Sequence, residues 1–257
     1  MTSFAFWEPI LIVTMINAML ALGFYVTMSS GILSVAHAAA AGMGAYAAAV
    51  LTTNFHWPFA PAVVVAIVVG GVVGAGLALV TMRMNLLVSS LVTLGFGETM
   101  SVIAFNIDYL GGASSFSGIP LRTTLGVTTG SLLLTIYVVW RYEGARIGLA
   151  ARAVRDNPLA AAANGIDVLR TRVIAFRLGA ALAAFAGAIS AHYSLVVNPA
   201  DLGFFPSFYM AWVLTFLPQL LRFAAVYRFA LYGLSIVLVI LLRPQGVLTR
   251  PRRSYER

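Results

Sequence analysis

Glu98 is the first residue in this sequence that could do chemistry, because it lies near the middle of a long apolar run, 86–105. A charge at the centre of a bilayer costs about 2.5–3.5 kcal/mol on insertion scales, so it needs a compensating role. Two interpretations stay open: a hydrogen-bonded packing element, or a group on a solute or proton pathway. Thr93, one turn and a half earlier, is a second pathway candidate.

His37 is the other candidate, and it follows a break in the hydrophobic pattern, GILSVAH at 31–37. Irregular backbone at membrane depth is tolerated where it is buried in protein or lines a wet cavity, and broken helices form binding or gating sites in transporters. His37 and Ser34 are therefore pathway candidates. The alternative is an ordinary interfacial loop with a hydrogen-bonded histidine.

A third feature is the polar stretch RIGLAARAVRDNPLAAAANGIDVLRTR at 146–172. Asn157 is a good N-cap, Pro158 suits a first helical turn, and Gly165 follows as part of a C-cap. These signals predict a short helix over 158–164, about 10 Å long. Such a helix is marginal alone, so it would serve to dock onto a partner.

The charges beside this helix, Arg152, Arg155 and Asp156, allow a second interpretation. The two arginines could hold the segment against anionic lipid, as a helix on the membrane surface.

The composition indicates that these segments lie in a lipid bilayer. Of 257 residues, 61% are hydrophobic and 9% are charged, whereas a soluble domain has about 25% charged residues. The sequence has no cysteine, which excludes disulfides and thiolate metal sites. The net charge of +8 comes from arginines between apolar runs and does not indicate nucleic-acid binding. No catalytic motif stands out, so we expect no enzyme activity and no cofactor.

The apolar runs predict an all-α, polytopic transmembrane bundle of about seven spanning helices plus one short interfacial or re-entrant helix. The predicted spans are 9–28, 36–53, 60–80, 86–105, 125–141, 173–197 and 226–242. The remaining run, 204–222, is interrupted by Pro206 and Pro218, and we expect it to return to the side from which it starts. Small residues every four positions, such as Gly179, Ala183 and Gly187, predict close helix seams.

Arginines set the expected orientation, since they are enriched in cytoplasmic loops. They gather in 141–177 and after residue 242. We therefore expect these regions, and with them the C-terminus, to be cytoplasmic and the loop 106–124 to be external.

Five stretches resemble the permease subunits of bacterial branched-chain amino-acid ABC importers, in their M-type form. They are GILSVAHAAAAGMGAY (31–46), VTLGFGE (92–98), YLGGASSFSGIP (109–120), GLAARAVRDNPLAAAANGIDVLRTRVIAF (148–176) and LLRPQGVL (241–248). The resemblance implies a single transmembrane permease domain over 1–257, in the bacterial inner membrane, with a cytoplasmic ATPase-coupling segment at 142–172. In that segment it implies coupling roles for Arg152, Arg155, Asp156, Asn157, Pro158 and Gly165.

The resemblance also implies partners: a second, H-type permease, two cytoplasmic ATPase subunits and a periplasmic substrate-binding protein, all in or at the lipid bilayer. The substrate would be a branched-chain or related small amino acid, with urea or short amides as alternatives. The family pattern has about twenty residues more than this chain near 211–213, which indicates a deletion there. Two other functions therefore stay open: a secondary carrier or channel with Glu98 and His37 as a proton relay, and a degenerate, non-conducting permease.

Overall fold

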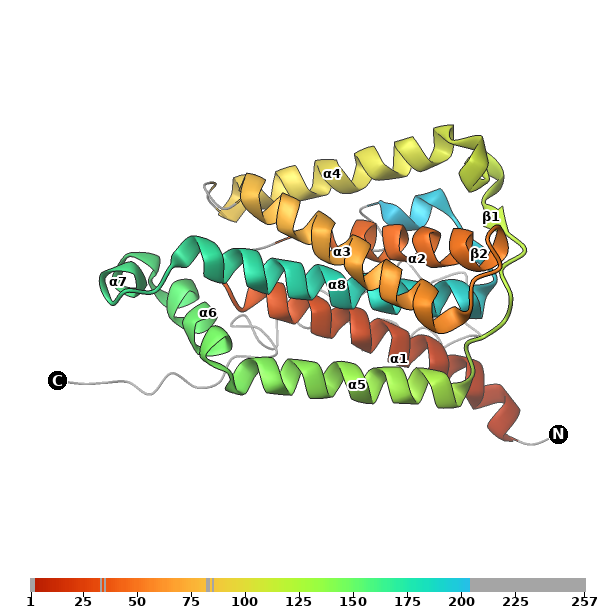
Figure 1. Ribbon diagram of the computed structural model, residues 1–257, viewed down its shortest axis with the longest axis horizontal. Coiled ribbons are helices and arrows are strands. Elements are labelled where there is room, and N and C mark those ends of the chain that lie inside the picture. The colour runs from red at the N-terminus through yellow and green to blue at the C-terminus, as the bar shows by residue number, and fades with distance from the viewer. Residues whose placement is uncertain (1–2, 33, 35, 82–83, 85, 204–257) are drawn as a thin grey trace, which may run out of the picture. The chain divides into compact units, whose positions relative to one another are not determined.

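The computed structural model describes residues 3–32, 34, 36–81, 84 and 86–203, all of which lie within one compact unit. This part of the chain is helical apart from one pair of two-residue strands, which confirms the all-α class (Figure 1). The long helices are α1 Ser3–Met28, α2 His37–Thr53, α3 Phe59–Thr81, α4 Leu86–Asn106, α5 Leu125–Gly144 and α8 Val168–Ser194. The shorter elements are η1 Asp108–Leu110, η2 Gly112–Ser114, β1 Phe116–Ser117, α6 Arg146–Asp156, α7 Pro158–Ala163, β2 Val196–Val197 and η3 Pro199–Leu202.

Helix α8 is the axis of the described bundle. It packs against α1, α2 and α3, while α5 lies along α1 and α4 lies beyond α2 and α3 (Figure 1). Its middle is almost completely buried: Ala183, Ala184, Ala186 and Ala188 have no exposed surface. An alanine-rich helix can have three neighbours at once because its side chains allow other backbones to approach closely.

Glycines make the closest of these approaches, as the small-residue pattern predicts. A Cβ on Gly23 of α1 would lie 2.8 Å from the carbonyl oxygen of Gly179. A Cβ on Gly187 would overlap the carbonyl of Ala41 in α2, and one on Gly44 would overlap Ala184. The seams of α8 with α1 and α2 are therefore backbone-to-backbone contacts.

Within the described residues, four helical stretches are long and apolar enough to cross a membrane: Trp7–Met28, Phe59–Thr81, Val88–Asn106 and Val168–Ser194. The predicted runs 36–53 and 125–141 are also helices, α2 and α5, but α2 has 17 residues and α5 is less apolar. The observed helix limits otherwise differ from the predicted ones by a few residues at each end. The runs 204–222 and 226–242, and the deletion near 211–213, lie outside the described residues.

The connections gather at two ends of the bundle, which we call the α7 end and the sheet end. The α7 end has the α1–α2 connection and the segment 145–167 (Figure 1). At the sheet end, β1 pairs antiparallel with β2. Beyond β2 the chain folds back along α2, so that a Cβ on Gly42 would overlap the side chain of Leu202.

Candidate functional site

The α6–α7 element forms as its capping residues predict. The Oδ1 of Asn157 accepts hydrogen bonds from the backbone N–H groups of Leu159 (3.1 Å) and Ala160 (3.0 Å). Gly165 has a φ of +78°, a left-handed conformation that glycine adopts without a steric penalty. Asp167 then caps α8 by accepting from the N–H of Arg170 at 2.9 Å. The short helix thus begins at a side-chain cap, Asn157, and is followed by a left-handed turn at Gly165.

Helix α6 attaches the α6–α7 element to the rest of the bundle. Its inner face, formed by Gly148, Ala151 and Val154, is buried. Arg152, from the same helix, donates through Nη2 to the carbonyl oxygen of Glu143 at 3.1 Å. Because α5 runs into α6 with a single residue between them, this bond fixes the angle at which α6 leaves the bundle.

The C-terminal turn of α6 also touches the α1–α2 connection. Gly31 has a φ of +80°, and a Cβ there would lie 3.0 Å from the Cα of Arg155. Two more contacts reach the end of α5. From α1, the Tyr25 hydroxyl donates to a carboxylate oxygen of Glu143, and from the α1–α2 connection, Ser29 Oγ lies 2.9 Å from the hydroxyl of Tyr142. A displacement of α6 would therefore press directly on the start of the α1–α2 connection.

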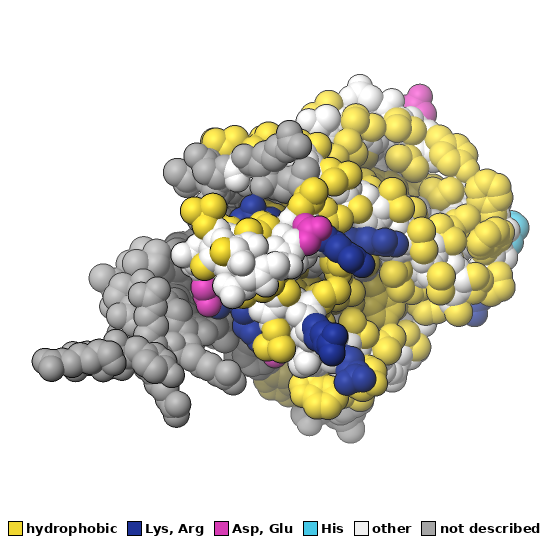
Figure 2. All heavy atoms as spheres, turned by 60° about the vertical axis from the view of Figure 1, so that its left-hand side comes forward, with side chains coloured by type: hydrophobic (Ala, Val, Ile, Leu, Met, Phe, Trp, Pro, Cys, Tyr) yellow, Lys and Arg dark blue, Asp and Glu magenta, His cyan; other side chains and the backbone are white. Residues whose placement is uncertain are grey.

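The outer surface of the element is apolar at its tip and charged at its base. Leu159 is 82% exposed, and Pro158 beside it is exposed as well. Arg155 and Asp156 form an exposed ion pair with Nε and Oδ1 3.3 Å apart. Figure 2 shows dark-blue arginine and magenta carboxylate side chains grouped at this end of the molecule. An apolar tip within a charged rim is suited to docking into a groove of a partner protein.

His37 is fully enclosed where α2 begins. Its Nε2 lies 3.1 Å from Thr27 Oγ1, and its ring packs edge-on against Phe24 with centroids 5.3 Å apart. Ser34 is buried beside it, and its Oγ accepts from the N–H of Ala36 at 3.3 Å. In one buried cluster the α1–α2 connection packs with Leu77 and Ala78, close to the C-terminal end of α3. The break therefore lies at the α7 end of the bundle and not at its middle.

Glu98 and Thr93 lie on different faces of α4. Thr93 is buried, and its hydroxyl donates back to its own helix, at 3.0 Å from the carbonyl oxygens of Ser89 and Ser90. Glu98 is exposed, and its Oε1 lies 3.1 Å from the Cβ position of Gly203.

Glu98 is nevertheless level with the start of α2. A Cβ on Gly97, its neighbour in α4, would lie 3.9 Å from Ala39, two residues after His37. The structure thus brings the two candidates to one level of the bundle, with His37 directed into the core and Glu98 against the returning chain. Their roles remain predictions.

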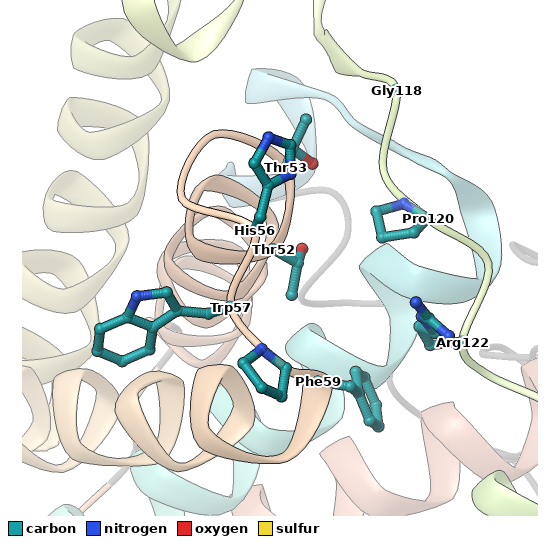
Figure 3. A pocket seen from close by; sticks show the side chains of 9 residues that line it. Thr52, Thr53, His56, Trp57, Phe59, Gly118, Pro120 and Arg122 are labelled. Carbon is teal, nitrogen blue, oxygen red and sulfur yellow. The ribbon is translucent and has the colours of Figure 1, made fainter.

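A pocket of about 610 Å³ at the sheet end was not anticipated from the sequence. Its lining comes from the end of α2, the α2–α3 connection, the start of α3 and the segment before α5: Thr52, Thr53, His56, Trp57, Pro58, Phe59, Gly118, Pro120 and Arg122. Figure 3 shows Arg122 and Trp57 on opposite sides of it. The sequence signal for this pocket is Arg122, the single cation in the loop 106–124.

The wall that carries Arg122 is tied to the end of α8. The N–H of Arg122 donates to the carbonyl oxygen of His192 at 3.4 Å, and the hydroxyl of Thr123 donates to that of Ile189 at 2.9 Å. Below the pocket, Thr52 Oγ1 lies 3.0 Å from Nε2 of His192. The pocket is therefore formed by segments that are fixed to each other.

Comparison with known proteins gives consistent matches. A family model described as the permease component of branched-chain amino acid transport systems matches residues 7–241. The high-affinity branched-chain amino acid transport system permease protein LivM of Salmonella typhimurium is 25% identical over 295 residues, which cover 93% of this chain and 69% of the relative. LivM of Escherichia coli K12 gives the same figures.

A third relative is named for a different substrate. The autoinducer 2 import system permease protein LsrC of an Enterobacter species (strain 638) is 29% identical over 195 residues, which cover 74% of this chain and 54% of that protein. No solved structure matches the chain. The alignment with LivM, 295 residues, is longer than this whole chain of 257, so the relative contains residues that have no counterpart here.

Proposed function

Because the chain belongs to the permease-component family of branched-chain amino acid transport systems, we propose that it carries a small amino acid inward across the bacterial inner membrane, powered by ATP hydrolysis in a partner. As a permease component it is a multi-pass membrane protein and not the ATP-hydrolysing subunit. Family membership implies an ATPase and a substrate-binding protein as partners. The proposed complex has two ATPase subunits, a second, H-type permease and a periplasmic binding protein.

The observation that carries this proposal is the capped α6–α7 element. It presents an exposed apolar tip at Leu159, and its base contacts the α1–α2 connection through Arg155 and Gly31. A partner that moved the tip would therefore move a connection between two long helices. We propose that residues 142–172 are the ATPase-coupling segment, with Arg152, Arg155, Asp156, Asn157, Pro158 and Gly165 shaping it.

The proposed topology has about seven spans, with α7 and the C-terminus in the cytoplasm and the sheet end outside. Six of the predicted spans correspond to α1–α5 and α8, whose connections alternate between the two ends of the bundle. Branched-chain amino acids are the first choice of substrate, because two matched relatives are named for them. Because LsrC is named for a different solute, other small solutes remain alternative substrates.

Asn157→Ala tests the coupling role. Loss of the cap should cost α7 about 1 kcal/mol, enough to loosen a one-turn helix. In proteoliposomes that contain the whole transporter, we expect ATP hydrolysis to persist while leucine uptake falls several-fold. Asn157→Asp, which retains a capping oxygen, should restore uptake. Normal transport by Asn157→Ala, at normal membrane abundance, would remove the coupling role.

The two alternative functions predict different results. A secondary carrier that relays protons through Glu98 and His37 would show uptake that follows the proton gradient without any ATPase. A non-conducting permease would assemble with its partners but fail to restore leucine uptake to a strain that lacks the transporter. The extra residues of the longer relative motivate this second test.

A further inference from the structure

The pocket at the sheet end has a lining that suits an anion. Its charged and ionisable side chains are Arg122 and His56, and no carboxylate is among the nine residues that line it. Thr52 and Thr53 also line the pocket, but the Thr52 hydroxyl is bonded to Ala48 and His192 and the Thr53 hydroxyl oxygen is buried. A free amino acid carries an ammonium group that would need a carboxylate or several acceptors. This lining therefore favours a group with net negative charge over a zwitterionic amino acid.

The rim of the pocket has the character of a membrane interface. Trp57 is 46% exposed and Phe55, two residues earlier, is 60% exposed. Tryptophan concentrates where hydrocarbon meets headgroups. We therefore infer from Trp57 that the pocket mouth faces the lipid phosphates.

An exposed apolar face of α3 continues from this rim. Val64, Val68 and Val72, one every four residues, are each more than half exposed. Residues four apart lie on one face of a helix, and α3 begins at Phe59, which lines the pocket. An occupant with an anionic head in the pocket would thus have an apolar helix face for a tail.

We propose that this pocket binds the phosphate headgroup of an anionic phospholipid, with the acyl chains along the exposed face of α3. Arg122 supplies the charge, and His56 is the other ionisable side chain of the lining. The site depends on the membrane location of the chain and not on which solute it transports. It would anchor the α2–α3 connection and the segment before α5 to the leaflet at the sheet end.

Thermal unfolding of the full-length protein in a neutral detergent tests the site. Phosphatidylglycerol should raise the melting temperature at concentrations where phosphatidylcholine and inorganic phosphate do not. Arg122→Gln should require about fivefold more phosphatidylglycerol for the same shift, the effect of one arginine at a charged lipid surface. Arg122→Lys should keep most of the response, because it keeps the charge.

Arg141→Gln is the matched control, since it removes the same charge from an exposed arginine at the other end of α5. An equal loss of response in Arg141→Gln would show a general charge effect and overturn the site. An undiminished response in Arg122→Gln would do the same. Stabilisation by inorganic phosphate equal to that by phosphatidylglycerol would mean a free-anion site in place of a lipid site. If Arg122→Gln does not fold, the lipid comparison on the wild type and on Arg122→Lys still decides.

Discussion

Two buried histidines are each held by a threonine from another helix. His37 of α2 contacts Thr27 of α1, and His192 of α8 contacts Thr52 of α2. Nδ1 of His192 lies 2.8 Å from the carbonyl oxygen of Ala188 and must donate to it. In the neutral ring Nε2 is then an acceptor, and the one proton of the Thr52 hydroxyl is shared between it and the carbonyl oxygen of Ala48 at 2.9 Å. These pairs are polar links between helices that otherwise meet through alanine and glycine.

Thr52→Val should therefore destabilise the bundle, because it leaves Nε2 of His192 buried without its partner. We expect a loss of about 1–3 kcal/mol, the usual cost of an unsatisfied buried polar group. Thr135→Val is the control, since Thr135 is fully buried but its hydroxyl donates to Ser131 of its own helix. Thermal melting in detergent measures both. Equal shifts would mean that the link to His192 contributes nothing.

At the scale of elements, glycine-to-alanine substitutions distinguish the effect of a close helix contact from the effect of helix propensity. Gly187→Ala places a methyl group against the backbone of Ala41 and should cost about 1–3 kcal/mol through overpacking. Gly76→Ala has open space around it and should be neutral or stabilise α3 by up to about 1 kcal/mol. Opposite signs of the two shifts in melting temperature are expected. A stabilising Gly187→Ala would contradict the α2–α8 seam.

The seat of α6 on the α1–α2 connection gives a second element-scale prediction. Gly31→Ala introduces a methyl group 3.0 Å from the Cα of Arg155 and should lower uptake while ATP hydrolysis continues. Gly118→Ala is the control, because Gly118 has a similar φ of +83° but nothing within 4 Å. Both variants carry the left-handed strain of about 1–2 kcal/mol. If Gly31→Ala and Gly118→Ala reduce uptake equally, backbone strain explains the reduction and the contact with Arg155 does not.

At the scale of the whole molecule, the proposed orientation can be tested cleanly because the chain has no cysteine. Leu121→Cys, at a position 60% exposed near the sheet end, should react with an impermeant maleimide in intact spheroplasts. Leu159→Cys, at the tip of α7, should react after the membrane is opened. Labelling of Leu159→Cys in sealed cells would invert the topology and, with it, the coupling proposal.

The sequence predicts most of the described helices because their causes are local. The apolar runs predict α1–α5 and α8 to within a few residues, and Asn157 and Asp167 define helix starts through bonds to neighbours in the chain. The pocket needs Arg122 and His56, which lie 66 positions apart, to meet at one end of the bundle. The return of Leu202 to Gly42 likewise depends on packing between distant segments. Hydrophobic periodicity and capping residues are local patterns and do not predict such contacts.

The position of α8 has a consequence for biosynthesis. It is the axis on which α1, α2 and α3 pack, yet it follows all of them in the chain. When α1 to α5 have left the ribosome, α8 has not yet been synthesised. The three helices that pack on it, α1, α2 and α3, therefore lack their common neighbour. Until α8 is inserted, the glycine-containing surfaces of these helices are exposed to lipid or to the insertion machinery. A nascent chain arrested before Val168 should therefore be far more sensitive to quality-control proteolysis than one arrested after Ser194.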